Sequence, residues 1–195
     1  MSMPMKFGLA LPDGDALRTA RLTRHAEEAG WDGCFVGDAI WCVDPIVALT
    51  AAAMQTSRIR LGTLCTSNAY RYPALLAKMG ATLDIISKGR LIMGVGGGWY
   101  QREFNAYDIP FYGVGERLRR LEEAVNIINR MWLDEEPSFQ GKYYTIQNAI
   151  CNPKPVQKPR PPILIGGGGE KVTLKLVAKY AYISNFFGDT SVVRH

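Results

Sequence analysis

Short apolar runs and longer amphipathic segments alternate along the chain. Short apolar runs bounded by turn residues are typical of buried strands, whereas apolar positions that recur every three or four residues are typical of helices. These patterns predict strands at 7–12, 33–38, 59–66, 90–96, 163–169 and 182–188. They predict helices at 15–30, 44–57, 73–87, in most of 99–132 and at 170–181.

Local signals support the predicted helices. Asp15 and Asp44 stand where N-caps are expected, and Pro45 follows Asp44 at the first helical position. Within 115–132, one face of the predicted helix is apolar and is expected to be core. Its residues, at spacings of three and four, are Leu118, Leu121, Val125, Ile128 and Trp132.

The alternation of strands and helices predicts an α/β fold with a parallel sheet covered by helices. Two architectures fit: a doubly wound open sheet and a (β/α)8 barrel of the TIM type with only about six strands present. Both place ligands at the carboxyl ends of the strands. Small and polar residues gather after the predicted strands, at 37–38, 65–68, 96–99, 166–170 and 184–186.

We expect a single domain over residues 1–195, with an insertion at 134–161. The segment 137–147 alternates polar and apolar residues around Gly141, which predicts a short hairpin. The proline-rich segment 152–162 predicts an extended connector.

Composition narrows the function classes. The hydrophobic fraction is 47%, the charged fraction 21% and the net charge +5, without a long basic tract, so we expect no nucleic-acid binding. The start of the chain lacks a signal peptide pattern, and the longest weakly polar run, 45–54, is too short to cross a membrane, so we expect a cytoplasmic protein. With two histidines and no CxxC pair, histidine-rich metal sites, zinc modules and Ser-His triads are disfavoured, which favours chemistry carried by a cofactor.

Two glycine runs follow predicted strands. Gly94 and Gly96 begin a dinucleotide-binding pattern, but Trp99 stands at its last glycine position, and Val172 breaks a P-loop pattern after Gly166–Gly169. The second run precedes a predicted helix, whose free N–H groups favour an anion; a tight turn without a ligand is the alternative. The first run suits either a flat ring or close packing of strand and helix.

Three segments, 71–111, 116–132 and 152–181, resemble the luciferase-like monooxygenase superfamily, most closely its coenzyme F420-dependent oxidoreductase branch. The likeness extends over about residues 5–194. It implies a (β/α)8 barrel that binds coenzyme F420 or, alternatively, FMN at its C-terminal face. It also implies a non-proline cis peptide bond within residues 63–65.

The resemblance implies a set of site residues. Asp38 matches a residue near the ring and is the candidate to orient or protonate the substrate. The cofactor-binding residues implied are Asp38, Thr66, Gly97, Gly98, Arg102, Gly168, Gly169, Lys171 and Val172. The last four belong to the loop that would hold the cofactor phosphate. No metal site is implied.

The chain departs from the family pattern in three ways. Ala39 replaces a histidine that follows Asp38 in many F420 enzymes, and Trp99 stands where sugar-phosphate dehydrogenases of the family carry glutamate. A sugar-phosphate substrate is therefore disfavoured. The chain also stops in the helix expected after strand six, and a typical barrel needs about 250 residues. We therefore expect either a piece of a longer protein or a homodimer in which two chains cover each other's open edges.

Three functions stay open at this point. The first is hydride transfer between coenzyme F420 and a small organic substrate. The second is an FMN-dependent flavin monooxygenase, and the third is a non-catalytic fragment or flavin-binding relative. The sequence identifies neither the substrate nor the oligomeric state.

Overall fold

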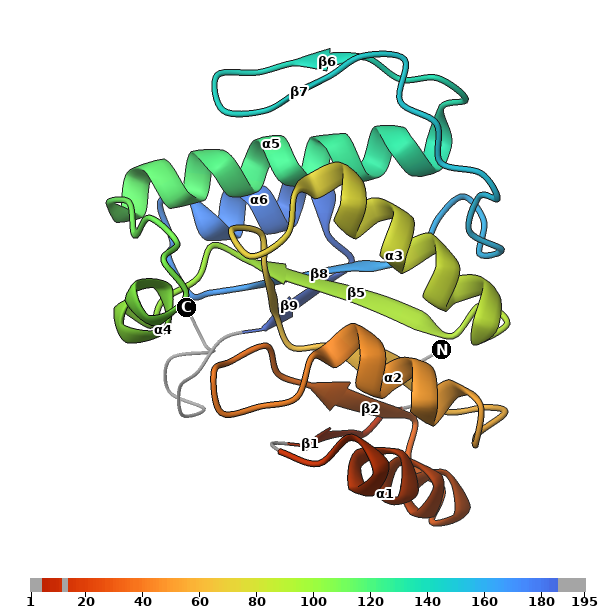
Figure 1. The fold of residues 1–195 in the computed structure, drawn as a ribbon. Coiled ribbons are helices and arrows are strands. Elements are labelled where there is room, and N and C mark those ends of the chain that lie inside the picture. The colour runs from red at the N-terminus through yellow and green to blue at the C-terminus, as the bar shows by residue number, and fades with distance from the viewer. Residues whose placement is uncertain (1–4, 12–13, 186–195) are drawn as a thin grey trace.

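The computed structural model of the protein describes residues 5–11 and 14–185 (Figure 1). Its strands are β1 Gly8–Leu11, β2 Gly33–Val36, β3 Arg60–Thr63, β4 Thr66–Ser67, β5 Leu91–Gly96, β6 Phe139–Gln140, β7 Thr145–Ile146, β8 Ile163–Gly166 and β9 Ile183–Asn185. Its helices are α1 Ala16–Glu28, α2 Pro45–Ala53, α3 Pro73–Ile86, α4 Gln101–Ala106, α5 Val114–Leu133 and α6 Thr173–Tyr180.

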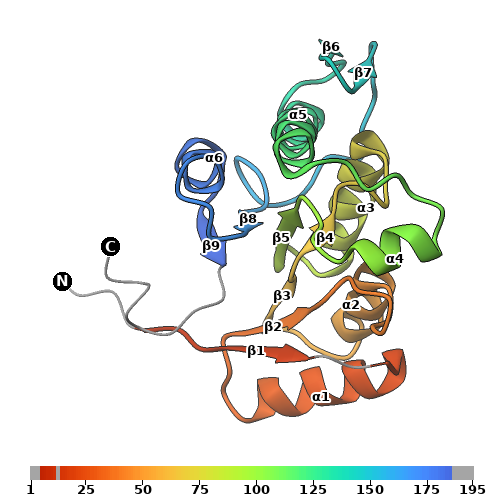
Figure 2. The ribbon, with the colours of Figure 1, turned by 90° about the vertical axis from the view of Figure 1, so that its left-hand side faces the viewer.

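The main sheet is parallel throughout, and its strand order follows the sequence: β1-β2-β3-β5-β8-β9, with β4 also paired to β5. Viewed from the side, the strands form an arc, and α1, α2, α3, α5 and α6 cover its outer face (Figure 2). A doubly wound sheet would reverse its strand order and carry helices on both faces. The fold is therefore a half-barrel of the TIM type, as predicted.

The main hydrophobic core lies between the outer face of the sheet and the helices. Alternate strand residues enter it, among them Val36, Leu61, Met93 and Ile165, all of which are fully buried. Burial of one such side chain contributes roughly 1.5–3 kcal/mol. The helix layer thus holds the strands in register, and the inner face is left to carry a site.

The inner face is built around Phe35 of β2. A Cβ atom added to Gly62 of β3 would lie 2.3 Å from the Phe35 ring, and one added to Gly8 of β1 would lie 2.7 Å from it. Because the ring extends over both neighbouring strands, only glycine fits at these two positions. Phe35 therefore fills the concave side of the arc beneath the carboxyl ends of the strands.

The predicted helix signals are confirmed. Asp15 Oδ1 accepts from the amides of Leu17 and Arg18, and Asp44 Oδ1 accepts from the Val47 amide at 3.0 Å. On α5, four residues of the predicted apolar face are buried and the fifth is partly buried: Leu121, Val125, Ile128, Trp132 and, partly, Leu118.

Several element boundaries differ from prediction. The segment 99–132 contains two helices, because residues 107–113, which include Pro110, form a connection between α4 and α5. Helix α6 begins at Thr173 rather than at residue 170, since the chain must first turn through residues 170–172. The predicted strand 182–188 is observed as β9, and its residues from 186 onward lie outside the described part.

The predicted hairpin is present as the antiparallel pair β6–β7, and it packs outside α5 (Figure 1). Glu123 of α5 anchors it, since its carboxylate accepts from the amides of Lys142, Tyr143 and Tyr144 at 2.8–3.1 Å. In the part of the chain that the structure describes, no helix is both long and apolar enough to span a membrane.

Candidate functional site

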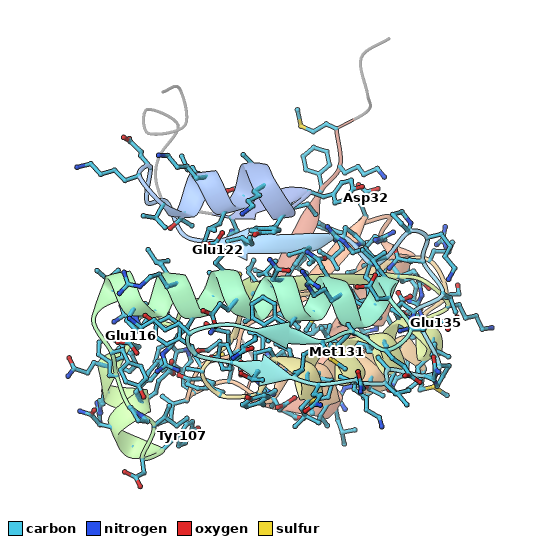
Figure 3. All side chains as sticks on the ribbon, turned by 90° about the horizontal axis from the view of Figure 1, so that it is seen from above. Asp32, Tyr107, Glu116, Glu122, Met131 and Glu135 are labelled. Atoms are coloured by element: carbon cyan, nitrogen blue, oxygen red, sulfur yellow. The ribbon has the colours of Figure 1, made fainter. Side chains whose placement is uncertain are left out.

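The predicted site residues follow four neighbouring strands. Asp38 comes after β2, Thr66 opens β4, Gly97 comes after β5 and Gly168 comes after β8. Since the strands are parallel, their carboxyl ends meet at one edge of the sheet, on the side where α4 lies in Figure 1. In Figure 3, Tyr107 and Glu116 mark this end, whereas Met131 and Glu135 lie toward the opposite end of α5.

Asp38 lies in a partly buried ionic cluster. Arg71 Nη1 donates to Asp38 Oδ2 at 2.7 Å, and Arg71 Nη2 donates to Asp44 Oδ2. The Ser67 amide also donates to Asp38 Oδ2, at 3.2 Å. We call Asp38, Asp44 and Arg71 the Arg71 cluster; it joins the β2–α2 loop to the start of α3.

Burial raises the pKa of Asp38, although the Arg71 guanidinium and the Ser67 amide act in the opposite direction. For Asp44, burial also opposes ionisation, but the Val47 amide and Arg71 outweigh it and lower the pKa. The Asp38 side chain, only 9% exposed, is thus a carboxyl group whose protonation depends on one cation.

The third-strand segment, residues 60–67 with β3 and β4, contains the predicted non-proline cis peptide bond, between Leu64 and Cys65. The Thr66 side chain is fully buried, and Thr66 lies opposite Val95, a residue of the core beneath the helices. Residues opposite each other in a parallel ladder share a face, so Thr66 faces the helices. It can meet a ligand on the inner face only through its main chain.

Cys65, which the sequence did not single out, lies between the two glycine runs. A Cβ added to Gly166 would lie 2.6 Å from Cys65 Sγ, and one added to Gly96 would lie 3.5 Å from Cys65 Cβ. Burial raises the pKa of the Cys65 thiol to about 12, so the group is a neutral thiol at physiological pH. It forms a floor at the inner edge of the site.

The first glycine run has a structural role of its own. Gly98 has φ +75°, and a Cβ there would lie 2.4 Å from the Phe104 ring. Close packing therefore explains the glycine at this position without any ligand. Gly97 lines a cavity, whereas Arg102 is exposed on α4 and lies outside the cavities described next.

The second glycine run turns away from the sheet into α6. Gly167 has φ +126°, and its amide donates to the Asn185 carbonyl at 2.8 Å. Residues 167–172, with Gly168, Gly169 and Lys171 among them, are exposed. Among the described residues, no side chain caps the N-terminus of α6 at Val172. The uncapped helix start, the exposed loop and the lysine together suit an anion.

Two cavities lie side by side at this edge, and Arg71 and Ile109 line both. The larger, about 430 Å³, is the Asp38 cavity, bordered by the Arg71 cluster and by Tyr70 and Tyr107. The smaller, about 180 Å³, is the Arg117 cavity, bordered by Asn68, Gly97, Tyr112, Arg117, Arg120 and Tyr144.

The Arg117 cavity contains unsatisfied polar atoms. Arg117 stacks on Phe111 at 4.1 Å, and its Nε atom is buried without a hydrogen-bond partner among the described residues. The same holds for Oδ1 of Asn68, whose Nδ2 donates to the Tyr144 hydroxyl at 3.4 Å. A ligand with both acceptor and donor groups, such as a phosphate ester with hydroxyls, would satisfy both atoms.

Sequence reasoning missed Arg71, Cys65 and Arg117 as site residues. Arg71 stands first in the segment that carries the family likeness, and Cys65 lies in the segment expected to contain a cis bond. The positions of Arg71 and Cys65 in these two segments were the signals by which the sequence could have indicated them. Arg117 belongs to a short basic cluster on α5. The direction in which the Arg117 side chain points depends on the loop 107–113, and no local sequence pattern specifies the conformation of this loop.

Comparison with known proteins decides the family. A family model described as luciferase-like monooxygenase matches residues 4–190. The chain belongs to the luciferase-like monooxygenase family. The family that the sequence resembles is thereby confirmed.

Relatives within this family differ in cofactor. The chain is 36% identical over 158 residues to the F420-dependent glucose-6-phosphate dehydrogenase of Kineococcus radiotolerans, across 76% of this chain and 46% of that protein. It is 39% identical over 95 residues to the FMNH2-dependent dimethylsulfone monooxygenase of Pseudomonas putida, across 49% of this chain and 26% of that one.

Among solved structures, the coenzyme F420 dependent tetrahydromethanopterin reductase from Methanopyrus kandleri matches with a TM-score of 0.83 at 27% identity, over 93% of this chain and 55% of that chain. The chain spans about half the length of the curated relatives it matches. Among residues 5–11 and 14–185, no three His, Cys, Asp or Glu side chains come together as a candidate metal site.

Proposed function

We propose that this chain is the cofactor-binding part of an F420-dependent oxidoreductase that transfers a hydride between coenzyme F420 and a small organic substrate. One observation carries the proposal: Asp38, the third-strand segment and both glycine runs meet at a single sheet edge, in a fold shared with F420-dependent relatives. Bound F420 would supply a ring that carries the hydride.

The residues present fit such a cofactor. Gly168, Gly169, Lys171 and Val172 would hold its phosphate, through exposed amides, a cationic side chain and the uncapped start of α6. On the inner face, Cys65 and the glycines around it leave a floor without bulky side chains.

The other implied residues would act in different ways. Gly97 would border the cofactor beside the Arg117 cavity. Thr66 would contribute a main-chain group, because its side chain faces the helices. Gly98 has no side chain, so it would also contribute only main-chain groups. Arg102, exposed on α4, would reach the cofactor only at its outer end.

Asp38 would orient the substrate or exchange a proton with it. Its carboxyl group borders the Asp38 cavity and is held in one position by Arg71 and the Ser67 amide. Because burial raises its pKa, the group can change protonation closer to neutral pH than an exposed aspartate. Ala39 cannot supply the proton that a histidine there would provide.

An FMN-dependent monooxygenase is the second candidate, favoured by the dimethylsulfone monooxygenase relative and by the Arg117 cavity. A flavin-binding relative without turnover is the third. Titration of the 195-residue chain with F420 and, separately, with FMN tests all three. Binding of F420 at least tenfold tighter than FMN supports the first proposal, the reverse order supports the second, and binding of both cofactors without such a preference supports the third.

A further inference from the structure

Three aromatic rings from two separate loops meet at the sheet edge that carries Asp38. Trp41 belongs to the β2–α2 loop, and Trp99 and Tyr100 belong to the β5–α4 loop. The Trp41 ring centroid lies 6.4 Å from that of Trp99 and 5.2 Å from that of Tyr100, with interplanar angles of 70°. Trp99 and Tyr100 are 5.3 Å apart. We call these three residues the aromatic cluster.

Packing among the described residues does not account for the cluster. Trp99 is 69% exposed and Trp41 is 54% exposed, and neither belongs to the hydrophobic core. Tryptophan rings left this open are uncommon away from contact surfaces, because each ring carries a large apolar area that is favourable to cover. The edge-to-face contacts between the rings hold them in one arrangement before any ligand arrives.

The cluster is continuous with the proposed cofactor site. Trp41 is three residues beyond Asp38, and Trp99 directly follows Gly98. Ile40, between Asp38 and Trp41, is also exposed, and its amide donates to the buried Glu103 carboxylate at 2.9 Å. The loop that carries Trp41 is thus fixed to α4, which holds the rings of Trp41 and Trp99 in fixed relative positions.

The charged groups of the Arg71 cluster, which borders the aromatic cluster, compensate one another. Asp38 and Asp44 pair with Arg71. None of the cation–π contacts found among the described residues involves a ring of the cluster. A phosphorylated substrate would have no unpaired cation of the Arg71 cluster to bind, whereas a flat apolar molecule would find open ring surfaces.

We infer that the aromatic cluster forms one wall of the substrate site and that the substrate is a neutral, flat, largely apolar organic molecule. The inference rests on the proposed function for the identity of the site, and it names the substrate class. Stacking on Trp41 or Trp99 would place such a molecule at the mouth of the half-barrel, next to Asp38.

The indole N–H signals of the four tryptophans provide a direct test. The 15N-labelled chain is titrated with 2-naphthol, a neutral flat probe, and separately with glucose 6-phosphate. We expect naphthol to shift the signals of Trp41 and Trp99. The signals of Trp31 and Trp132 are internal controls and should not shift. Trp31 is 39% exposed and precedes β2, at the opposite end of the strands. Trp132 is buried, and its indole N–H donates to the Ala77 carbonyl.

Variants then measure the contribution of each ring. Trp99→Ala and Trp41→Ala should each raise the dissociation constant of naphthol about threefold to tenfold, while Trp31→Ala leaves it unchanged. Shifts of equal size at Trp31, or equal shifts of Trp41 and Trp99 with glucose 6-phosphate, would overturn the inference; the wild-type titration gives this answer even if a variant does not fold.

A parallel titration with F420 separates the two proposals. If naphthol shifts Trp41 and Trp99 but neither F420 nor FMN binds, the proposed function fails and the apolar binding surface stands. If a cofactor binds and naphthol does not shift these two signals, either with the cofactor or without it, the substrate-class inference alone fails.

Discussion

At the scale of single residues, Arg71 is the group on which the site depends most. It compensates two carboxylates from one loop, and it lines both cavities. The side chains of Arg71 and Asp38 are 13% and 9% exposed, so little water is available to replace either partner. Loss of the cation would leave Asp38 as a buried, uncompensated charge at neutral pH.

We therefore predict that Arg71→Met lowers the free energy of unfolding by about 2–4 kcal/mol at pH 7. The pKa of Asp38, already raised by burial, would rise further without the guanidinium. Above that pKa the buried charge of Asp38 destabilises the variant. As the pH falls through that pKa, Asp38 becomes protonated and the loss of unfolding free energy becomes smaller. Urea unfolding of both proteins between pH 4.5 and pH 8, a range that begins just above the ordinary carboxyl pKa of about 4, measures this dependence.

Asp44→Asn is the matched control. It removes the more exposed carboxylate, keeps the Asp38–Arg71 pair and leaves a residue that can still cap α2. We expect it to cost less than about 1 kcal/mol. An Arg71→Met variant whose loss is the same at acid and neutral pH would show that the Arg71 cluster has no electrostatic role.

Gly168 tests the proposed phosphate loop. Gly168→Asp would place a negative charge where the cofactor phosphate is proposed to bind, and it should weaken binding of F420 or FMN about tenfold or more. Gly168→Asn has nearly the same shape without the charge, so it should weaken binding less. Equal dissociation constants for the wild type and both variants, measured by fluorescence titration, would contradict the placement of the phosphate.

The same scale shows what the sequence could predict of the site. Asp38 and the two glycine runs were predictable because each lies directly after an apolar run, where a parallel sheet collects its ligands. Arg71 and Arg117 were not, because long side chains reach partners that the fold alone brings near. Gly98 has a packing reason that the sequence does not show, since a Cβ there would lie 2.4 Å from the Phe104 ring; its contact with a cofactor stays a prediction.

At the scale of elements, the hairpin depends on one helix side chain. Glu123 accepts three successive amides of the segment that connects β6 to β7, and this segment carries Tyr144 to the Arg117 cavity. We predict that Glu123→Ala lowers the free energy of unfolding by about 1–3 kcal/mol and speeds hydrogen exchange of the amides of residues 142–144.

Glu122→Ala is the control for this prediction, because Glu122 directly precedes Glu123 on α5 and contacts only the exposed Lys179 and the Tyr180 hydroxyl among the described residues. It should change the stability by less than about 1 kcal/mol and leave exchange at residues 142–144 unaltered. If both variants lose the same stability, the three amide contacts do not anchor the hairpin.

Element boundaries were predictable where a local signal exists, as with Asp15 and Asp44 at the starts of α1 and α2. The break between α4 and α5 was not, although Pro110 lies within it. Helical periodicity on both sides concealed a connection of several residues. The start of α6 likewise depends on where the chain finishes turning away from β8, and this is a property of the sheet rather than of the local sequence.

At the scale of the whole molecule, periodicity left an open sheet and a barrel as equal alternatives. The choice depends on the order of strands and on which face the helices cover, and neither leaves a local signal in the sequence. The sequential order β1-β2-β3-β5-β8-β9 and the single helix-covered face decide it. The family likeness was the only route to this answer from the sequence.

The same topology predicts a gradient of local stability. β5 is buried along its whole length and pairs with β3, β4 and β8, whereas among the described strands β1 pairs only with β2 and β9 only with β8. Amides of β5 can exchange only when most of the sheet opens, so we expect them to exchange slowest, and those of β1 and β9 to exchange fastest among the strands of the main sheet.

Hydrogen exchange followed by mass spectrometry, at low and high protein concentration, checks this gradient. At low concentration, protection of β1 and β9 equal to that of β5 would contradict it. If two copies of the chain cover each other's outer strands, as in the homodimer that the sequence leaves open, protection of β1 and β9 should rise with concentration while that of β5 stays constant.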